Sequence, residues 1–168
     1  EAWRDYGTRW EGLHAHPNGM QPQTGARTVW LELEDTLGNV SRLEASTILD
    51  QDAPTGRVTI HANQDDGETS DQVWTLQIEA TDASSRVKEM RASNDQGATW
   101  SPWRSYDSVW LGYDSEAFGG DSRVGAKVVT LEFRDAAGHV SEPVIATVER
   151  VEGDSSDECG MILGDRKS

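Results

Sequence analysis

Apolar and polar residues alternate in short runs along most of this chain, and clusters of Gly, Asp, Asn and Ser separate the runs. A period of two is typical of strands buried on one face, whereas an amphipathic helix needs a period near 3.6. No long segment follows the helical period. The pattern predicts strands at 3–6, 27–34, 40–49, 57–62, 73–80, 87–93, 99–106, 108–111, 127–134 and 140–150.

The alternation also predicts which side chains point inward. In the strand at 73–80, Trp74, Leu76 and Ile78 lie on one face, and in the strand at 127–134 the same holds for residues such as Leu131 and Phe133. The last seven predicted strands occupy about 100 residues and are separated by turn signals. This density of short strands predicts an all-β fold with two packed sheets.

The chain repeats itself with a period of 100 residues. When 1–41 is placed under 101–141 without a gap, fifteen of the forty-one positions are identical. In the first copy these are Trp3, Arg4, Tyr6, Trp10, Gly12, Gly19, Gly25, Ala26, Val29, Leu31, Glu32, Asp35, Gly38, Val40 and Ser41. A fixed period defines the structural unit, which here has the size of a domain.

The repeat divides the chain into three parts. Residues 53–151 form one complete unit, and residues 1–52 correspond to the C-terminal half of another. Residues 152–168 are expected to form an acidic linker or tail. We expect the half unit to be completed by a neighbouring repeat of the same protein or by strands from another chain, because its inward positions otherwise have no facing sheet.

Charge and composition exclude some functions. The chain has 30 acidic and 15 basic side chains, for a net charge of −15. Nucleic-acid binding needs clustered basic residues, so no nucleic-acid partner is expected. No apolar run is long enough to span a membrane, and membrane insertion is not expected. Cys159 is the only cysteine, so an internal disulfide is impossible.

One octapeptide carries a recognisable turn signature. Ser93, Asp95, Gly97, Thr99 and Trp100 give the S-x-D-x-G-x-T-W pattern of the Asp-box. The pattern predicts a hairpin in which Asp95 accepts bonds from turn amides, Gly97 takes a positive φ and Trp100 folds over the turn. Asp-boxes occur in sialidase propellers, but a propeller needs a repeat of about 40–50 residues. The structural interpretation is therefore favoured.

Three segments together carry a family resemblance: 48–60, the block 89–103 that contains the Asp-box, and 129–141 with its Asp135-Ala-Ala-Gly138-His139 turn. They are similar to the bacterial Ig-like or fibronectin type III-like repeats found in tandem in secreted and cell-surface proteins. The chain departs from the family at His139, where Asn is usual and Asn39 keeps it. The resemblance implies an Ig-like/fibronectin III-like β-sandwich.

The resemblance also implies a function: a non-catalytic structural or adhesive spacer in a large extracellular or cell-surface protein. Two alternatives stay open. The chain could be an accessory module of an extracellular hydrolase, or a subunit of an extracellular assembly completed by strands of another chain. We expect no enzymatic activity, because no nucleophile elbow appears. His14 and His16 share a loop without a nearby carboxylate, and Cys159 has no close basic neighbour in sequence.

The only cofactor that the residues suggest is calcium. Asp50 and Asp52 lie in the linker between units, Asp82 in the loop after the strand at 73–80, and Asp135 in the last hairpin turn. In a seven-strand sandwich these three segments meet at one end. Clustered carboxylates repel unless a hard cation such as Ca²⁺ neutralises them. The alternative is that each Asp only caps its own turn.

The tryptophans suggest two kinds of contact. Most recur at the 100-residue spacing, which favours packing over a sugar-stacking platform. Trp30 differs because it lies between the inward Val29 and Leu31, and Thr130 replaces it in the second copy. We expect Trp30 to point outward as part of a contact surface.

Overall fold

The computed structural model describes residues 5, 7, 24–62 and 67–153. This part of the chain is all-β, as the alternation predicts, and contains no helix. Consequently none of the described residues forms a helix of the length and apolarity needed to cross a membrane. The expected strand at 3–6 and most of the expected tail at 152–168 lie outside the described residues.

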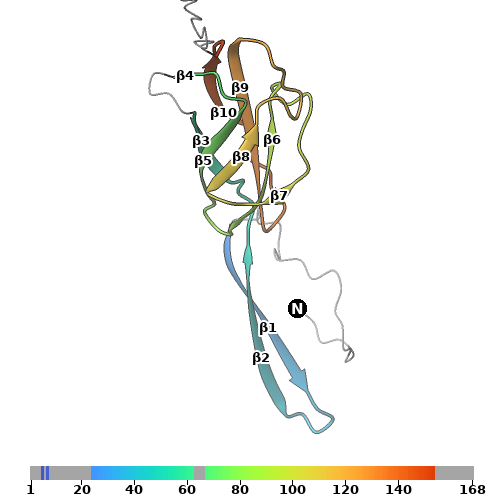
Figure 1. Cartoon of the computed structure of the whole chain (residues 1–168). Coiled ribbons are helices and arrows are strands. Elements are labelled where there is room, and N and C mark those ends of the chain that lie inside the picture. Colours follow the sequence, from blue (N-terminus) through green and yellow to red (C-terminus); the bar gives the residue numbers. More distant parts are fainter. Residues whose placement is uncertain (1–4, 6, 8–23, 63–66, 154–168) are drawn as a thin grey trace, which may run out of the picture.

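Ten strands make up the described chain (Figure 1). They are β1 (Gly25–Glu34), β2 (Val40–Leu49), β3 (Thr55–His61), β4 (Glu68–Thr69), β5 (Val73–Thr81), β6 (Val87–Ser93), β7 (Arg104–Ser105), β8 (Val109–Asp114), β9 (Gly125–Asp135) and β10 (Val144–Arg150).

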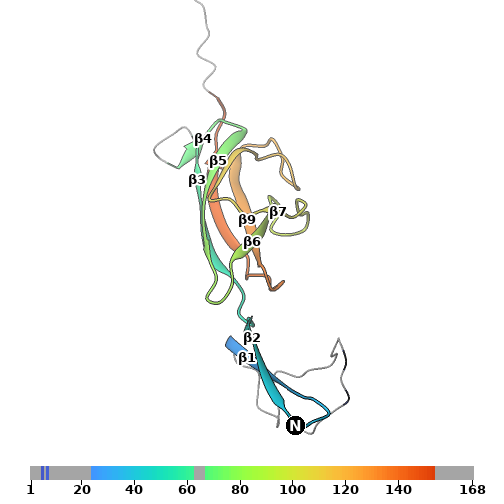
Figure 2. The ribbon, with the colours of Figure 1, turned by 90° about the horizontal axis from the view of Figure 1, so that it is seen from below.

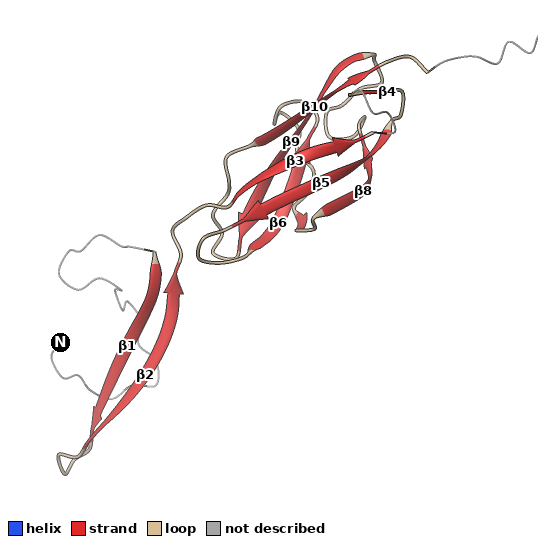
Figure 3. Ribbon diagram, turned by 90° about the vertical axis from the view of Figure 1, so that its left-hand side faces the viewer, coloured by secondary structure: helices blue, strands red, loops and turns tan. Residues whose placement is uncertain are grey.

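Strands β3 to β10 form a sandwich of two sheets. One sheet has the order β4-β10-β9-β6-β7 and the other the order β3-β5-β8. Figure 2 shows the two layers packed face to face. Strands β1 and β2 form a separate two-stranded hairpin that projects from the end of the sandwich where the linker 50–54 enters (Figure 3).

The core lies between the two sheets of the sandwich. Alternate residues of β5 are buried, as period-two alternation requires. In β9 the alternating residues Val129, Leu131 and Phe133 are buried, and Thr130 between the first two is buried as well. Val58 and Ile60 of β3 pack against this core. The buried apolar residues are Trp74, Leu76, Ile78, Met90, Ala92, Tyr113, Val129, Leu131, Phe133 and Val148.

The predicted boundaries differ most from the structure in two strands. The expected strand at 99–106 is reduced to β7, because the chain before it is still engaged in the 93–100 turn. The expected strand at 140–150 begins only at Val144, although Val140 makes an isolated bridge to Arg134. Pro143 lies between them and has no N–H to donate to a ladder. The two-residue strand β4, parallel to β10, has no alternation that could predict it.

The hairpin β1–β2 is the counterpart of β9 and β10. Strand β1 begins 100 residues before β9, and both are followed by an Asp-x-x-Gly turn. In the first turn, Asp35 Oδ1 accepts hydrogen bonds from Leu37 N–H and Asn39 N–H at 2.8 and 2.9 Å. The sequence repeat is thus a repeat of local structure in the part of the chain that is described.

Candidate cation site at the joint

Three acidic residues converge where the hairpin joins the sandwich. Asp50 directly follows β2, Asp82 directly follows β5, and Asp135 is the last residue of β9. Each lies where a strand ends, so its side chain is positioned by the turn that follows. The sequence predicted that the linker and these two loops meet at one end, and the structure brings them together there.

Asp135 is held by its own turn. Its Oδ1 accepts hydrogen bonds from Gly138 N–H at 2.6 Å and His139 N–H at 2.9 Å, while Oδ2 lies 3.0 Å from His139 Nδ1. Gly138 supplies the positive φ of 103° that the turn needs. The Asp135 side chain is fully buried, which raises its pKa, but the bonds from His139 and Gly138 outweigh burial and leave the pKa below its ordinary value. Asp135 is therefore a carboxylate at neutral pH.

Asp82 is fixed in a similar way. Its Oδ1 accepts hydrogen bonds from Ser84 N–H at 2.9 Å and Ser85 N–H at 2.7 Å. Burial raises the pKa of Asp82, but these amides, with smaller contributions from the Ser85 and Asp50 side chains, lower it below its ordinary value. Its second oxygen, Oδ2, is buried and has no hydrogen-bond partner.

Asp50 completes the group. Its Oδ1 accepts a hydrogen bond from Asp52 N–H at 3.1 Å, and its Oδ2 is buried without a hydrogen-bond partner. One potential ligand atom each from Asp50, Asp135 and His139 lies within 4.8 Å of the other two. The Asp50 side chain is also close enough to Asp82 to influence the pKa of that residue.

The group whose ligand atoms lie within 4.8 Å of one another differs from the predicted set at three positions: it lacks Asp52 and Asp82 and contains His139. Asp82 lies beside it, next to Asp50. Asp52 is exposed, and it contacts the cluster only through its backbone N–H, which donates to Asp50 Oδ1. His139 does join the cluster, and the sequence analysis did not propose it as a ligand. The sequence held a signal for His139, because it replaces the Asn39 of the first copy. Asn39 Nδ2 donates to Asp35 Oδ2 at 2.8 Å, and His139 Nδ1 contacts Asp135 in the same way.

The donor set suits a hard divalent cation. Unpaired buried carboxylate oxygens are costly, and oxygens are the ligands that Ca²⁺ prefers. Asp50 and Asp82 each offer one such oxygen. His139 faces Asp135 through Nδ1, so its geometry is that of a side chain that orients a carboxylate.

The 93–100 turn has the geometry expected from its sequence. Ser93 Oγ donates to Asp95 Oδ1 at 2.7 Å, and Thr99 N–H donates to the same oxygen at 2.7 Å. Gly97 has a φ of 92°, and a Cβ at this position would lie 3.1 Å from the Trp100 ring. These contacts are internal to the fold, and they support a structural turn.

Arginine and tryptophan side chains stack on the outer face of the five-stranded sheet. The Arg91 guanidinium lies 4.4 Å from the centre of the Trp100 ring and 4.7 Å from that of Trp103. The Arg134 guanidinium lies 4.4 Å from the centre of the Trp103 ring, so Trp103 contacts two arginines. Arg91 also pairs with Glu132 at 2.6 Å across β6 and β9. Trp100 and Trp103 are half-buried and already occupied by arginines.

Trp30 points outward, as the sequence predicts. It is 56% exposed on β1, and its only ring contact among the described residues is the guanidinium of Arg42, 5.1 Å from the ring centre.

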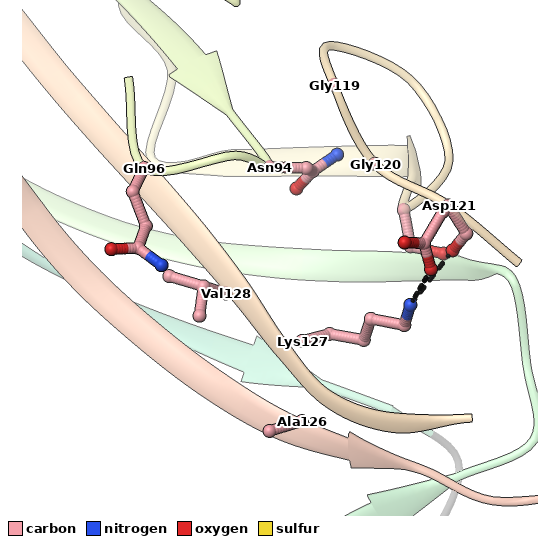
Figure 4. Close-up of a pocket in the computed structure, with 9 residues that line it drawn as sticks. Asn94, Gln96, Gly119, Gly120, Asp121, Ala126, Lys127 and Val128 are labelled. Atoms are coloured by element: carbon pink, nitrogen blue, oxygen red, sulfur yellow. Dashed lines mark hydrogen bonds and ion pairs between the residues drawn. The ribbon is translucent and has the colours of Figure 1, made fainter. Parts of the chain in front are cut away.

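A small polar pocket lies beside the long loop between β8 and β9 (Figure 4). Its volume is about 150 Å³, and Asn94, Ser115 and Lys127 are among the residues that line it. Lys127 Nζ is paired with Asp121, and Asn94 Nδ2 donates to the carbonyl oxygens of Asp114 and Ala117. Because these polar groups are used to hold the loop, the pocket is a weaker candidate site than the joint.

No protein-family model matches the chain, and a search of curated proteins finds no match.

Proposed function

We propose that this chain is a non-catalytic structural or adhesive spacer module of a larger extracellular or cell-surface protein. The observation that carries the proposal is the serial arrangement of repeated β units. The hairpin β1–β2 and the sandwich β3–β10 share the 100-residue repeat and are joined by the short linker 50–54. Units linked end to end extend a protein without requiring chemistry in any one of them.

The strand order supports the Ig-like or fibronectin type III-like class. With β3, β5, β6, β7, β8, β9 and β10 taken as strands A, B, C, C′, E, F and G, the three-stranded sheet has the order A-B-E. The five-stranded sheet has the order C′-C-F-G with the two-residue β4 added beside G. This arrangement belongs to the sandwich architecture shared by many cell-surface domains. It supports a spacer by analogy of fold, and analogy of fold alone does not specify function.

Two alternatives make different predictions for the native polypeptide. A spacer is accompanied by further 100-residue units, and an accessory module of a hydrolase by a catalytic domain. A subunit of an assembly receives the missing strands from a separate chain. Measuring the intact mass of the native polypeptide and mapping its peptides separates the three. Further repeats support the spacer, whereas a catalytic domain contradicts it.

We also propose that Ca²⁺ binds at the joint and stiffens it. The two buried, unpaired oxygens of Asp50 and Asp82 are the observation that supports binding, together with the buried carboxylate of Asp135 beside Asp50. A cation shared between the linker and two loops of the sandwich would restrict rotation about the linker. Neutralising the cluster would also remove carboxylate repulsion.

Isothermal titration of the full chain with Ca²⁺ tests this proposal. We expect one binding event that is weakened at least tenfold by Asp82→Asn. The matched control is Asp107→Asn, because Asp107 caps an exposed turn outside the cluster by accepting from Val109 N–H at 3.2 Å. Equal heats for the chain and Asp82→Asn, or no calcium-dependent heat, would leave turn capping as the only role of these aspartates.

A further inference from the structure

The hairpin β1–β2 has an apolar face that resembles half of a sandwich core. In its register Val29 lies opposite Ala45 and Leu31 opposite Leu43, so these four side chains share one face. Val29 is 39% exposed and Leu43 is 54% exposed. An apolar sheet face open to solvent indicates a contact surface.

The complete unit shows what covers the same positions. Val129 and Leu131, which correspond to Val29 and Leu31, are fully buried. They belong to one core cluster with Leu76 and Ile78 of β5 in the facing sheet. The residues of the hairpin face therefore have the identities of core residues, and in the complete unit strands β3 and β5 bury them.

The edge of β1 away from β2 also indicates a partner with the strands of the complete unit. In the complete unit, β9 pairs with β10 on one side and with β6 on the other. Strand β1 pairs only with β2 within the described chain. One edge of β1 is thus available for the strand that would correspond to β6, and unpaired strand edges pair readily with a further strand.

The sequence of the half unit keeps a tyrosine that contacts β5 in the complete unit. In the complete unit, Tyr106 Oη accepts a hydrogen bond from Ala80 N–H of β5 at 3.1 Å, and its ring contacts Phe133 edge-on at 6.3 Å. Position 6, its counterpart 100 residues earlier, is also Tyr. A tyrosine that holds β5 in one copy is retained in the other.

We propose that the Val29–Leu31 face of β1, and the edge that the described residues leave unpaired, bind a three-strand polypeptide segment with the pattern of β3, β5 and β6, supplied by a neighbouring repeat. The segment would place alternating apolar residues on the hairpin face and a strand along β1. In the complete unit the corresponding segment is residues 53–100, which directly precede the repeated part 101–141. The proposal rests on the proposed function, since it assumes that the units of a spacer share one fold.

The alignment provides an experiment with a defined splice. A copy of residues 53–100 is fused directly to Glu1 of the full chain, and amide hydrogen exchange of β1 is measured in the fusion and in the chain alone. We expect the β1 amides on the edge away from β2 to exchange at least tenfold more slowly in the fusion. The same rate in both proteins overturns the proposal.

Two variants of the fusion distinguish a specific core from general association. Leu31→Asp places a charge on the hairpin face and should return the β1 amides to the rate of the chain alone. Thr28→Asp is the matched control, because Thr28 lies on the opposite, exposed face, and it should keep the protection. Protection that survives Leu31→Asp contradicts docking on this face. The spacer proposal is tested separately, by the mass and peptide map of the native polypeptide. Failure of the docking proposal therefore leaves the spacer proposal standing, and the reverse also holds.

Discussion

Tyr113 is a buried residue whose hydroxyl has a specific hydrogen-bond partner. Its side chain is fully buried, and its hydroxyl donates to Asn94 Oδ1 at 2.7 Å. Asn94 in turn donates to the carbonyls of Asp114 and Ala117, so one hydroxyl supports the loop that follows β8. Burial raises the pKa of Tyr113 well above its ordinary value, although the bond to Asn94 acts in the opposite direction.

This shift predicts a loss of stability at alkaline pH. An unfolded tyrosine ionises near pH 10, while Tyr113 in the folded chain stays protonated. Between these two pKa values the unfolded state binds fewer protons, so the free energy of unfolding falls as pH rises above about 10.

Tyr113→Phe, which removes only the hydroxyl, tests whether Tyr113 causes the loss of stability at alkaline pH. We expect the variant to lose about 1 kcal/mol of stability at pH 7, because Asn94 Oδ1 loses its donor. We also expect its free energy of unfolding to fall less steeply than that of the parent above pH 10, as measured by urea unfolding at several pH values. Parallel pH profiles for the two proteins would show that Tyr113 does not carry the effect.

At the scale of elements, the 93–100 turn connects β6 to the chain that becomes β7. Trp100 is half-buried, and it packs over Gly97 and against Arg91. Removing it exposes the turn but leaves the hydrogen bonds of Asp95 in place.

We expect Trp100→Ala to cost about 2 kcal/mol, which is less than the 3–5 kcal/mol typical of a fully buried tryptophan. The midpoint of thermal unfolding should fall by roughly 10 °C for a domain of this size. Trp30→Ala is the matched control, since Trp30 lies on the hairpin and should leave the midpoint of the sandwich unchanged. An unchanged midpoint for Trp100→Ala would mean that packing over the turn does not stabilise the sandwich.

The elements with clear alternation could be predicted from the sequence. The bounds of β2 and β6 agree with prediction, and the inward residues of β5 and β9 are buried. The late start of β10 could not be predicted from alternation, because the pattern continues through Pro143 while the ladder does not. Convergence of Asp50, Asp82 and Asp135 followed from their positions at strand ends. The exposure of Asp52 and the inclusion of His139 depend on turn geometry that spacing alone does not specify.

At the scale of the whole molecule, the chain enters and leaves the sandwich at opposite ends. The linker 50–54 enters at one end, and residues 151–153 leave at the other (Figure 3). A force applied between these points acts along β3 at entry and along β10 at exit. The ladders β3–β5 and β9–β10 each join seven residue pairs. Loading along the strands strains the hydrogen bonds of a ladder together, whereas loading across it would open them one at a time.

We propose that this chain is a spacer, and a spacer that holds its reach must stay folded when it is pulled. Stretching a single molecule held at its two ends tests this most directly. We expect residues 53–151 to stay folded until one abrupt step, which releases close to 100 residues of chain at roughly 3.3–3.6 Å each. Ca²⁺ should not be needed for that step, because the cation site lies at the joint and outside the β3–β5 and β9–β10 ladders. Gradual lengthening without a step, at forces that leave other β-sandwich domains folded, would contradict a spacer role.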